Sequence, residues 1–117
     1  MLFVVDYPPS QAALARIRED SVAVAERFEL FLHGVELANG FHELLDAGQQ
    51  CQRFKNENRV REQSGQASVD YDEHLVAALQ SGLPACSGVA IGFDRLVMLA
   101  AGLAELDAAM PFSFQRV

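Results

Sequence analysis

The sequence predicts an α+β fold, in which an antiparallel sheet carries flanking helices on one face. The first observation is a stretch from Val24 to Leu45 that is rich in Phe, Leu and Val and is interrupted by His33-Gly34, a pattern that indicates a β-hairpin. Two helix signals follow this stretch, and one more short apolar strand comes near the C-terminus. With 117 residues, the chain fits a single domain over residues 1–117.

The first element along the chain is a strand. Leu2 to Val5 is a short run rich in β-branched residues, and Pro8-Pro9 stops it, so a turn should follow. Because no basic segment precedes this run, we interpret it as a strand and not as a signal peptide.

The first helix should follow the hairpin. Asp46 has Gln49 three residues later, which is the spacing of a capping box, so the helix should run from Ala47 to Gln63. Within it, Glu57 and Arg61 have the i,i+4 spacing of an ion pair.

The second helix should start near Asp72 and end at Gly82, since Pro84 forbids its continuation. Three of its apolar side chains should be buried: Leu75, Val76 and Leu79. The chain should then form a short strand from Cys86 to Ile91, a hinge at Gly92 and an apolar helix from Phe93 to Ala101.

Composition and charge narrow the class of protein. Half of the residues (50%) are hydrophobic and 21% are charged, as in a globular domain, and no run approaches the roughly 20 apolar residues of a membrane helix. A net charge of −7 argues against a nucleic-acid-binding surface, so we interpret the basic stretch from Arg53 to Arg61 as a solvated helix face. Cys51 and Cys86 lie far apart, which favours reduced thiols.

Two carboxylates stand out in the hairpin. With a turn at His33-Gly34, Glu29 lies opposite Ala38 and shares a face with Glu36, at about 7–8 Å between backbones. Two carboxylates on one face repel unless a cation lies between them, and Mg²⁺ accepts carboxylate and phosphate oxygens together. The alternative is the plain polar face of an edge hairpin. The other face should be a core made of Phe28, Leu30, Leu32, Val35 and Leu37.

The stretch ELANGFHEL carries more polar groups than a core strand needs. Alternation places Asn39, Phe41 and Glu43 on one face, where they could supply an amide, an aromatic wall and an anion. For Glu36 to lie on that face as well, a bulge is needed near Ala38–Gly40, and the glycine there can supply it.

Three motifs of known enzyme classes are not found in the sequence. His42-Glu43 begins like the helix motif of a zinc protease, but Asp46 stands where the second histidine belongs. Near the C-terminus, CSGVAIGFDRLVML contains neither a Walker A loop nor a GxGxxG pattern.

Small residues mark the last strand. Gly88, Ala90 and Gly92 would leave it open to a flat ligand, and Arg95 begins the following helix. Alternatively, the glycines are needed only because the strand and the following helix pack closely where the chain turns from one to the other.

Three stretches together carry a resemblance to a known family: RFELFLHGVELANGFHEL, QRF in the following helix, and GVAIGFDRLVML. They resemble the C-terminal part of the catalytic domain of class II lysyl-tRNA synthetases. The last stretch matches motif 3 of that family, at residues 88–99. The resemblance covers nearly the whole chain, from FVVDYPPSQAALA to PFSFQRV.

The resemblance implies an ATP-dependent ligase that activates a lysine-type amino acid as an adenylate. By that resemblance, Glu29 and Glu36 would hold the Mg²⁺ that is bound to ATP. Gly92 and Arg95 would belong to the ATP site, and Arg95, the candidate catalytic residue, would lie over the adenine.

The resemblance also assigns the amino-acid site. Asn39 would bind the carboxylate end of the substrate, Phe41 would pack along its methylene chain, and Glu43 would pair with its ε-ammonium group. Ala90 would contact the substrate near its reacting end.

Three residues distinguish a branch within the family. Ala38, His42 and Ala90 depart from the usual lysyl-tRNA synthetase pattern and resemble the elongation factor P (R)-β-lysine ligase branch, synthetase paralogues that attach (R)-β-lysine to a lysine of elongation factor P. A lysyl-tRNA synthetase fragment that charges tRNA with lysine is one alternative. A non-catalytic, synthetase-derived interaction module is another.

The two distant cysteines and the lack of a signal-peptide pattern lead us to expect a cytoplasmic protein, and the apolar runs are too short for a membrane helix. The resemblance further implies a homodimer in the full-length form. The family's motif 1, which makes the dimer, is not found in these residues. Neither is motif 2, whose arginine binds the α-phosphate. We therefore expect the 117 residues to be inactive alone.

Overall fold

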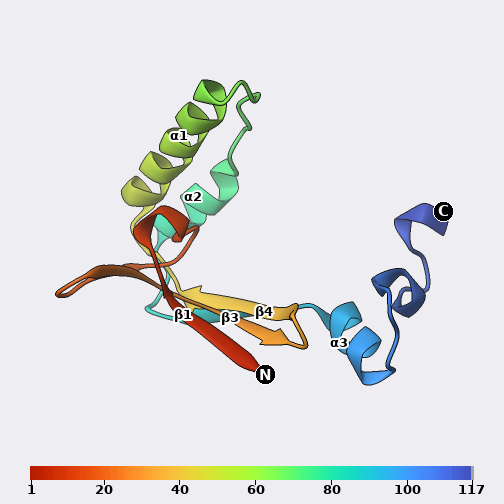
Figure 1. Ribbon diagram of the computed structural model, residues 1–117. Coiled ribbons are helices and arrows are strands. Elements are labelled where there is room, and N and C mark those ends of the chain that lie inside the picture. The colour runs from red at the N-terminus through yellow and green to blue at the C-terminus, as the bar shows by residue number, and fades with distance from the viewer. Residues whose placement is uncertain (117) are drawn as a thin grey trace.

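The computed structural model describes residues 1–116, and an antiparallel sheet of five strands forms its centre (Figure 1). The strand order is β1-β3-β4-β5, and β2 pairs with β3 beside that path. The strands are β1 (Leu2–Tyr7), β2 (Ile17–Glu19), β3 (Ala23–Leu32), β4 (Val35–His42) and β5 (Ser87–Ile91). The helices are α1 (Ala47–Gln63), α2 (Glu73–Ser81) and α3 (Phe93–Ala100), with 3₁₀ turns at η1 (Pro9–Gln11), η2 (Leu106–Ala109) and η3 (Phe114–Arg116). The α+β prediction is confirmed.

The turn between β3 and β4 is the predicted two-residue turn. His33 and Gly34 have φ angles of 51° and 80°, both in the left-handed region. This combination is typical of the tight turn that matches the twist of a hairpin. A glycine at the second position adopts that angle without steric cost.

A bulge at Leu37 of β4 changes the register of the hairpin. Leu37 has no Cα partner on β3, so Glu29 lies opposite Asn39, and the predicted pairing with Ala38 is wrong. The bulge falls one residue before the stretch in which the sequence predicts it. Its effect is the expected one, because the extra residue brings Glu36 and Asn39 to the same face of the sheet.

Helix α1 has the predicted bounds, Ala47–Gln63. Its N-terminus is capped by Asp46, whose Oδ1 accepts a hydrogen bond from the Gln49 amide at 2.8 Å. The expected ion pair of Glu57 with Arg61 does not form in the described chain. Arg61 donates instead to the carbonyl oxygen of Ala67 at 3.0 Å, which ties the end of α1 to the following loop.

Helix α2 is capped by Asp72, which accepts a hydrogen bond from the Leu75 amide at 3.2 Å. It ends at Gly82, as predicted. Val76 is buried, whereas Leu75 and Leu79 are only half-buried. The strand and helix that follow agree with the prediction to within one residue at their ends.

A small core joins the loop before β2 to the sheet. Its buried members are Ala12, Ala15 and Ala25, with Tyr7, Ile17 and Phe41 packed against them. Arg53 of α1 donates to the carbonyl oxygens of Ala13 at 2.9 Å and Ala15 at 2.7 Å. Burial lowers the pKa of Arg53, so the prediction of a wholly solvated basic helix face is wrong at this residue.

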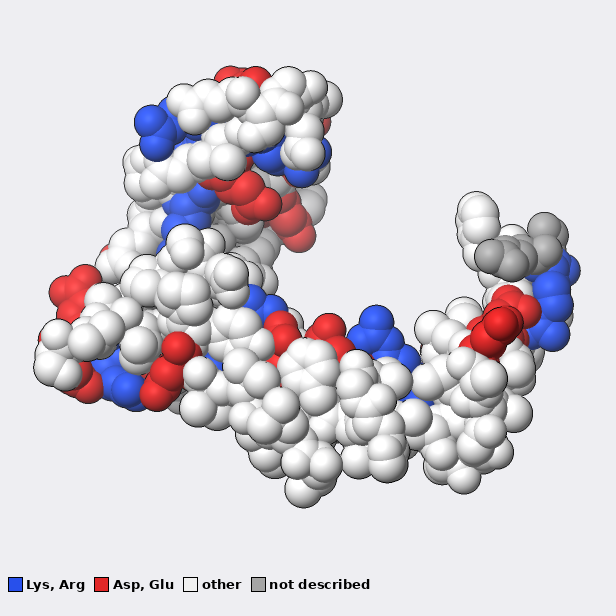
Figure 2. All heavy atoms as spheres, viewed as in Figure 1, with Lys and Arg blue, Asp and Glu red and all other residues white. Residues whose placement is uncertain are grey.

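The two sides of the sheet differ. Helices α1 and α2 rise from one end of one side, and α3 and the C-terminal turns extend beyond the other end (Figure 1). Within the part of the chain that the structure describes, no helix covers the opposite side. Acidic and basic side chains gather in the hollow between these two parts, and the surface below is almost free of them (Figure 2). On that second face of the sheet, four large apolar side chains are more than half exposed: Phe3, Val5, Val89 and Ile91.

The predicted core on that second face is therefore not packed in this chain. Leu37 is buried, but the other predicted core residues, Phe28, Leu30, Leu32 and Val35, are half-buried. The radius of gyration is 17.2 Å, against about 13 Å for a compact domain of this length. The accessible surface of 8296 Å² likewise exceeds the roughly 6,300 Å² of a compact protein of this mass.

Candidate active site

The predicted site residues lie in rows across strands β3, β4 and β5. Glu29, Asn39 and Ala90 form one row of paired positions, and the row beside it contains Arg27, Phe41 and Gly88. In the row toward the turn, Phe31 pairs with Glu36. Paired residues point to the same face of a sheet, so the bulge brings the predicted carboxylates, amide and aromatic ring onto one face, called here the site face.

Arg95 is positioned by the strand-to-helix corner. The Gly92 amide donates to the carbonyl oxygen of Leu37 at 2.8 Å, which anchors the start of α3 at the bulge. From the first turn of α3, Arg95 Nη1 donates to the carbonyl oxygen of Glu36 at 2.8 Å and lies 3.7 Å from its Oε2. The guanidinium is 44% exposed, so its outer face is free to contact a ligand.

Two glycines make room for the chain's own side chains. A Cβ at Gly88 would lie 2.6 Å from Oε1 of Glu43, and one at Gly92 would lie 3.2 Å from Cδ of Arg95. These contacts fit the alternative of close packing at the strand-to-helix corner, and the flat ligand stays a prediction. Ala90, between them, is exposed on the site face.

Glu43 follows β4 directly, and its amide donates to the carbonyl oxygen of Cys86 at 3.0 Å. Its carboxylate lies over Gly88, and within residues 1–116 no cationic side chain pairs with it. It borders a pocket of about 520 Å³ at the end of β4. An anion that is half-buried and lacks a cation suits an ammonium ligand.

His42 points away from the site. Its partner on β5 is Ser87, on the opposite face, and its Nδ1 lies 3.4 Å from Oε2 of Glu26. Arg16 is the main reason that the pKa of Glu26 is lowered. His42 ends β4 and Glu43 follows it, so neither residue lies in a helix, where the zinc-protease motif belongs.

The sequence analysis missed two residues of the site face, Arg27 and Tyr7. Arg27 could have been found by alternation, since it lies two residues before Glu29 on the same strand. Tyr7 could not, because Asp6 adopts a left-handed φ of 56° where β1 and β3 change register, and Tyr7 then lies under Arg27. Burial, and next a hydrogen bond to Glu29, raise the pKa of Tyr7, so its hydroxyl stays protonated at neutral pH.

Glu29 and Glu36 could supply part of the coordination shell of the implied magnesium ion. No group of three or more His, Cys, Asp or Glu that could hold a metal occurs among the described residues. Glu29 and Glu36 nevertheless present two hard oxygen donors on one face, and the Glu36 carboxylate is 39% exposed. Mg²⁺ commonly takes one or two carboxylates and completes its shell with phosphate oxygens and water. These two residues suit that arrangement.

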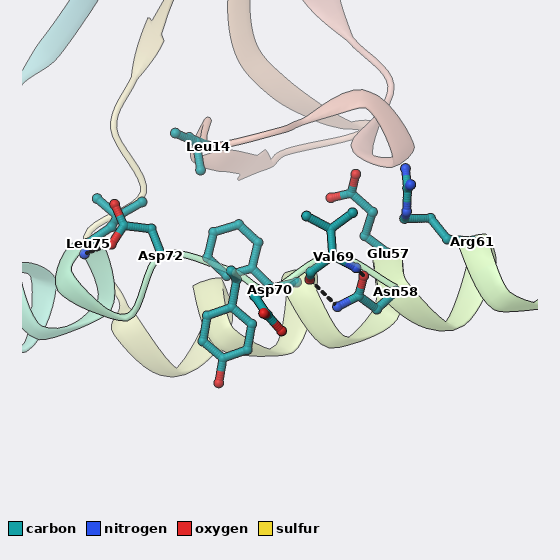
Figure 3. Close-up of a pocket in the computed structure, with 10 residues that line it drawn as sticks. Leu14, Glu57, Asn58, Arg61, Val69, Asp70, Asp72 and Leu75 are labelled. Atoms are coloured by element: carbon teal, nitrogen blue, oxygen red, sulfur yellow. Dashed lines mark hydrogen bonds between the residues drawn. The ribbon is translucent and has the colours of Figure 1, made fainter. Parts of the chain in front are cut away.

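A second pocket, of about 400 Å³, lies away from the site face, between α1 and the loop that leads to α2 (Figure 3). Leu14 faces this loop from across the pocket. Asn58 binds both the amide and the carbonyl group of Val69, at 2.9 and 2.8 Å. The pocket contains none of the residues predicted to bind ATP or the amino acid.

Comparison with known proteins shows the family of this chain. The model of the class II tRNA synthetases (D, K and N) matches residues 1–116. The chain belongs to this family. No helix among the described residues of this synthetase-family chain is long and apolar enough to span a membrane.

Curated relatives are similar over nearly the whole chain. It is 52% identical over 115 residues to the elongation factor P (R)-β-lysine ligase of Edwardsiella ictaluri, covering 98% of this chain and 35% of the relative. It is 51% identical over 114 residues to the ligases of that name from Photorhabdus laumondii and Vibrio cholerae. Each of these matches covers 97% of this chain and 35% of the relative. The chain thus spans about a third of their length.

Proposed function

We propose that the polypeptide containing this chain activates a lysine-type amino acid with ATP and transfers it to a lysine side chain of elongation factor P. The observation that carries the proposal is the site face. It brings together the carboxylates of Glu29 and Glu36, the amide of Asn39, the ring of Phe41, and the carboxylate of Glu43, which has no cationic partner within residues 1–116. The names of the similar ligases support the choice of substrate and acceptor. Cytoplasmic location and a homodimer belong to the same proposal.

The amino acid is held at both ends by this chain. Glu43 pairs with the ε-ammonium, Phe41 packs along the methylene chain, and Asn39 donates to the carboxylate. This fixes the carboxylate at the row of Glu29 and Ala90, where the α-phosphate of the co-substrate ATP must lie for attack. No protein nucleophile is needed, because positioning and charge stabilisation carry the step.

The ATP side of the site is built from the neighbouring row and the helix corner. Arg95, placed by Gly92, stacks its planar guanidinium on the adenine. Glu29 and Glu36 would hold Mg²⁺, which when bound neutralises phosphate charge. The carboxylate of the amino acid attacks the α-phosphorus and pyrophosphate leaves. The acceptor amine then attacks the carbonyl carbon of the adenylate, an amide bond forms, and AMP leaves.

The decisive experiment uses the full-length polypeptide. We expect pyrophosphate exchange that depends on lysine or (R)-β-lysine, and a mass increase of elongation factor P by one such residue. Charging of tRNA without modification of the factor would favour a lysyl-tRNA synthetase instead. If neither amino acid supports exchange, the proposal is overturned in favour of a non-catalytic module.

Ala90 provides a test of the β-lysine branch. It adds a methyl group on the site face, opposite Asn39, where α- and β-amino acids differ. A change of this size is worth about 1–3 kcal/mol, so we expect a preference for (R)-β-lysine over α-lysine that Ala90→Gly weakens. The two amino acids are compared by pyrophosphate exchange, with Ala104→Gly as a control in an exposed loop. A wild-type preference for α-lysine would contradict this assignment.

A further inference from the structure

Arg27 occupies the centre of the site face. Its Nε donates to Oδ1 of Asn39 at 3.0 Å, its Nη2 lies 2.5 Å from Oε1 of Glu29, and its Nη1 donates to the carbonyl oxygen of Gln11 at 2.9 Å. Its Cζ lies 4.5 Å from the ring centroid of Tyr7. With only 17% of the side chain exposed, every edge of the guanidinium is engaged and the group is held in one orientation.

This orientation determines which way the amide of Asn39 points. A guanidinium has donors and no acceptor, so Arg27 can pair only with the amide oxygen of Asn39. The amide NH₂ group must then turn away from Arg27. In this state Asn39 offers donors, which are the groups that a substrate carboxylate needs. Without Arg27, either end of the amide could face the ligand.

The same guanidinium holds the neighbouring carboxylate. Glu29 is only 14% exposed, so its charge requires a partner, and Arg27 supplies it at hydrogen-bond distance. Tyr7, protonated at neutral pH, lies beneath the pair. Arg27 therefore links the amide assigned to the amino acid with one of the carboxylates assigned to the metal, and both sit in the row beside its own.

We propose that Arg27 is a positioning residue for the carboxylate end of the amino acid, acting through the amide of Asn39 and not by direct contact. The proposal rests on the function proposed above. Lysine cannot replace this arginine, because a single ammonium group lacks the planar fork that binds Asn39, Glu29 and the Gln11 carbonyl at once.

The experiment compares two ligands of the full-length polypeptide. Lysine carries both an ε-ammonium and a carboxylate, whereas cadaverine (1,5-diaminopentane) carries the ammonium group without a carboxylate. For Arg27→Lys we expect lysine affinity to fall by about 10- to 100-fold, the range for loss of a charge-assisted hydrogen bond. The inhibition constant of cadaverine, measured by competition against lysine, should change by less than about threefold.

Arg18→Lys is the matched control. Arg18 also pairs with a glutamate of β3, since its Nη1 lies 3.7 Å from Oε1 of Glu26, but on the opposite face of the sheet. Both affinities should stay unchanged in this variant. In an Asn39→Ala background, Arg27→Lys should no longer alter the ratio of lysine to cadaverine affinity, because the group it orients is gone.

Different outcomes separate this inference from the proposed function. Failure of the wild-type polypeptide to bind either lysine or (R)-β-lysine would overturn both. Lysine binding by the wild type with equal loss of lysine and cadaverine affinity in Arg27→Lys would overturn the positioning role alone. An unchanged lysine affinity, or an effect that persists undiminished in the Asn39→Ala background, would overturn it as well.

Discussion

Glu36 and Glu29 lie on the same face but differ in environment. The Glu29 side chain is 14% exposed and is neutralised by Arg27, whereas the Glu36 side chain is 39% exposed and, within residues 1–116, forms an ion pair with Arg95 alone, at 3.7 Å. A pair at that distance and exposure contributes little to stability. Glu36 is thus the carboxylate whose removal should affect function with the smallest effect on folding.

The first prediction concerns Glu36→Gln in the full-length polypeptide. The amide keeps the shape but loses the negative charge that a divalent cation requires, so adenylate formation should fall by about a hundredfold or more. Pyrophosphate exchange measures the effect, and thermal unfolding checks that the protein is folded. Glu26→Gln, on the other face of the hairpin, is the control. Unchanged exchange in Glu36→Gln would rule out the metal role.

The second prediction concerns Glu43 and substrate choice. A half-buried carboxylate without a cation of its own disfavours a substrate that leaves it unpaired, a situation that costs about 3–5 kcal/mol when fully buried. We therefore expect lysine to be preferred over norleucine by on the order of a hundredfold. Glu43→Gln should reduce this ratio in pyrophosphate exchange. Norleucine activated nearly as well as lysine by the wild type would contradict the assignment.

At the scale of elements, β4 and β5 each contain a glycine, Gly40 and Gly88, whose missing side chain makes room for a different group. A Cβ at Gly40 would lie 2.7 Å from the carbonyl oxygen of Gly88 and 2.7 Å from the ring of Phe28. A Cβ at Gly88 would instead meet the far end of the Glu43 side chain, at 2.6 Å. Backbone cannot move out of the way, whereas a flexible carboxylate can.

The third prediction follows from the contacts that a Cβ would make at Gly40 and at Gly88. Gly40→Ala should destabilise the protein by about 1–3 kcal/mol, because the sheet must shift to admit the methyl group. Gly88→Ala should leave the unfolding midpoint nearly unchanged but displace Glu43 and lower the preference for lysine over norleucine. Both variants are measured by denaturant unfolding and by pyrophosphate exchange. A large stability loss in Gly88→Ala with unchanged specificity would show that Glu43 does not depend on this gap.

At the scale of the whole molecule, two features stand out. On the side of the sheet away from the site face, four apolar side chains are each more than half exposed: Phe3, Val5, Val89 and Ile91. Monomeric proteins rarely expose a large apolar patch of this kind to solvent. The site face carries two cations, but Arg27 is already paired with Glu29, and the net charge is −7. Positive charge for the phosphates of ATP is therefore scarce in these residues.

The fourth prediction follows from both features. The 117 residues alone should show no measurable pyrophosphate exchange and should self-associate in sedimentation experiments. Adding the rest of the natural polypeptide as a separate chain should reduce self-association and restore some activity. Robust exchange by the chain alone would mean that the cation binding the α-phosphate lies within these residues.

Local sequence determined most of the elements. Asp46 and Asp72 cap their helices, His33-Gly34 makes the hairpin turn, and Pro8-Pro9 ends the first strand, each through contacts within a few residues. Strand β2 was missed, because it is three residues long and is defined by its pairing with β3, which is not visible in the local sequence. Motif likeness pointed to the family, which the comparisons confirm.

The geometry of the site depended on contacts that are distant in the sequence. The site residues were predicted from motifs, but their alignment in rows depends on the bulge at Leu37. The carbonyl oxygen of Leu37 accepts a hydrogen bond from the amide of Gly92, 55 residues later in the sequence. Arg27 gains its role only where Asn39 and Gln11 meet it. The sequence by itself determined the elements, the family and the candidate residues. Tertiary structure decided the face they share and the groups that orient them, because register and ion pairing depend on partners that local sequence does not specify.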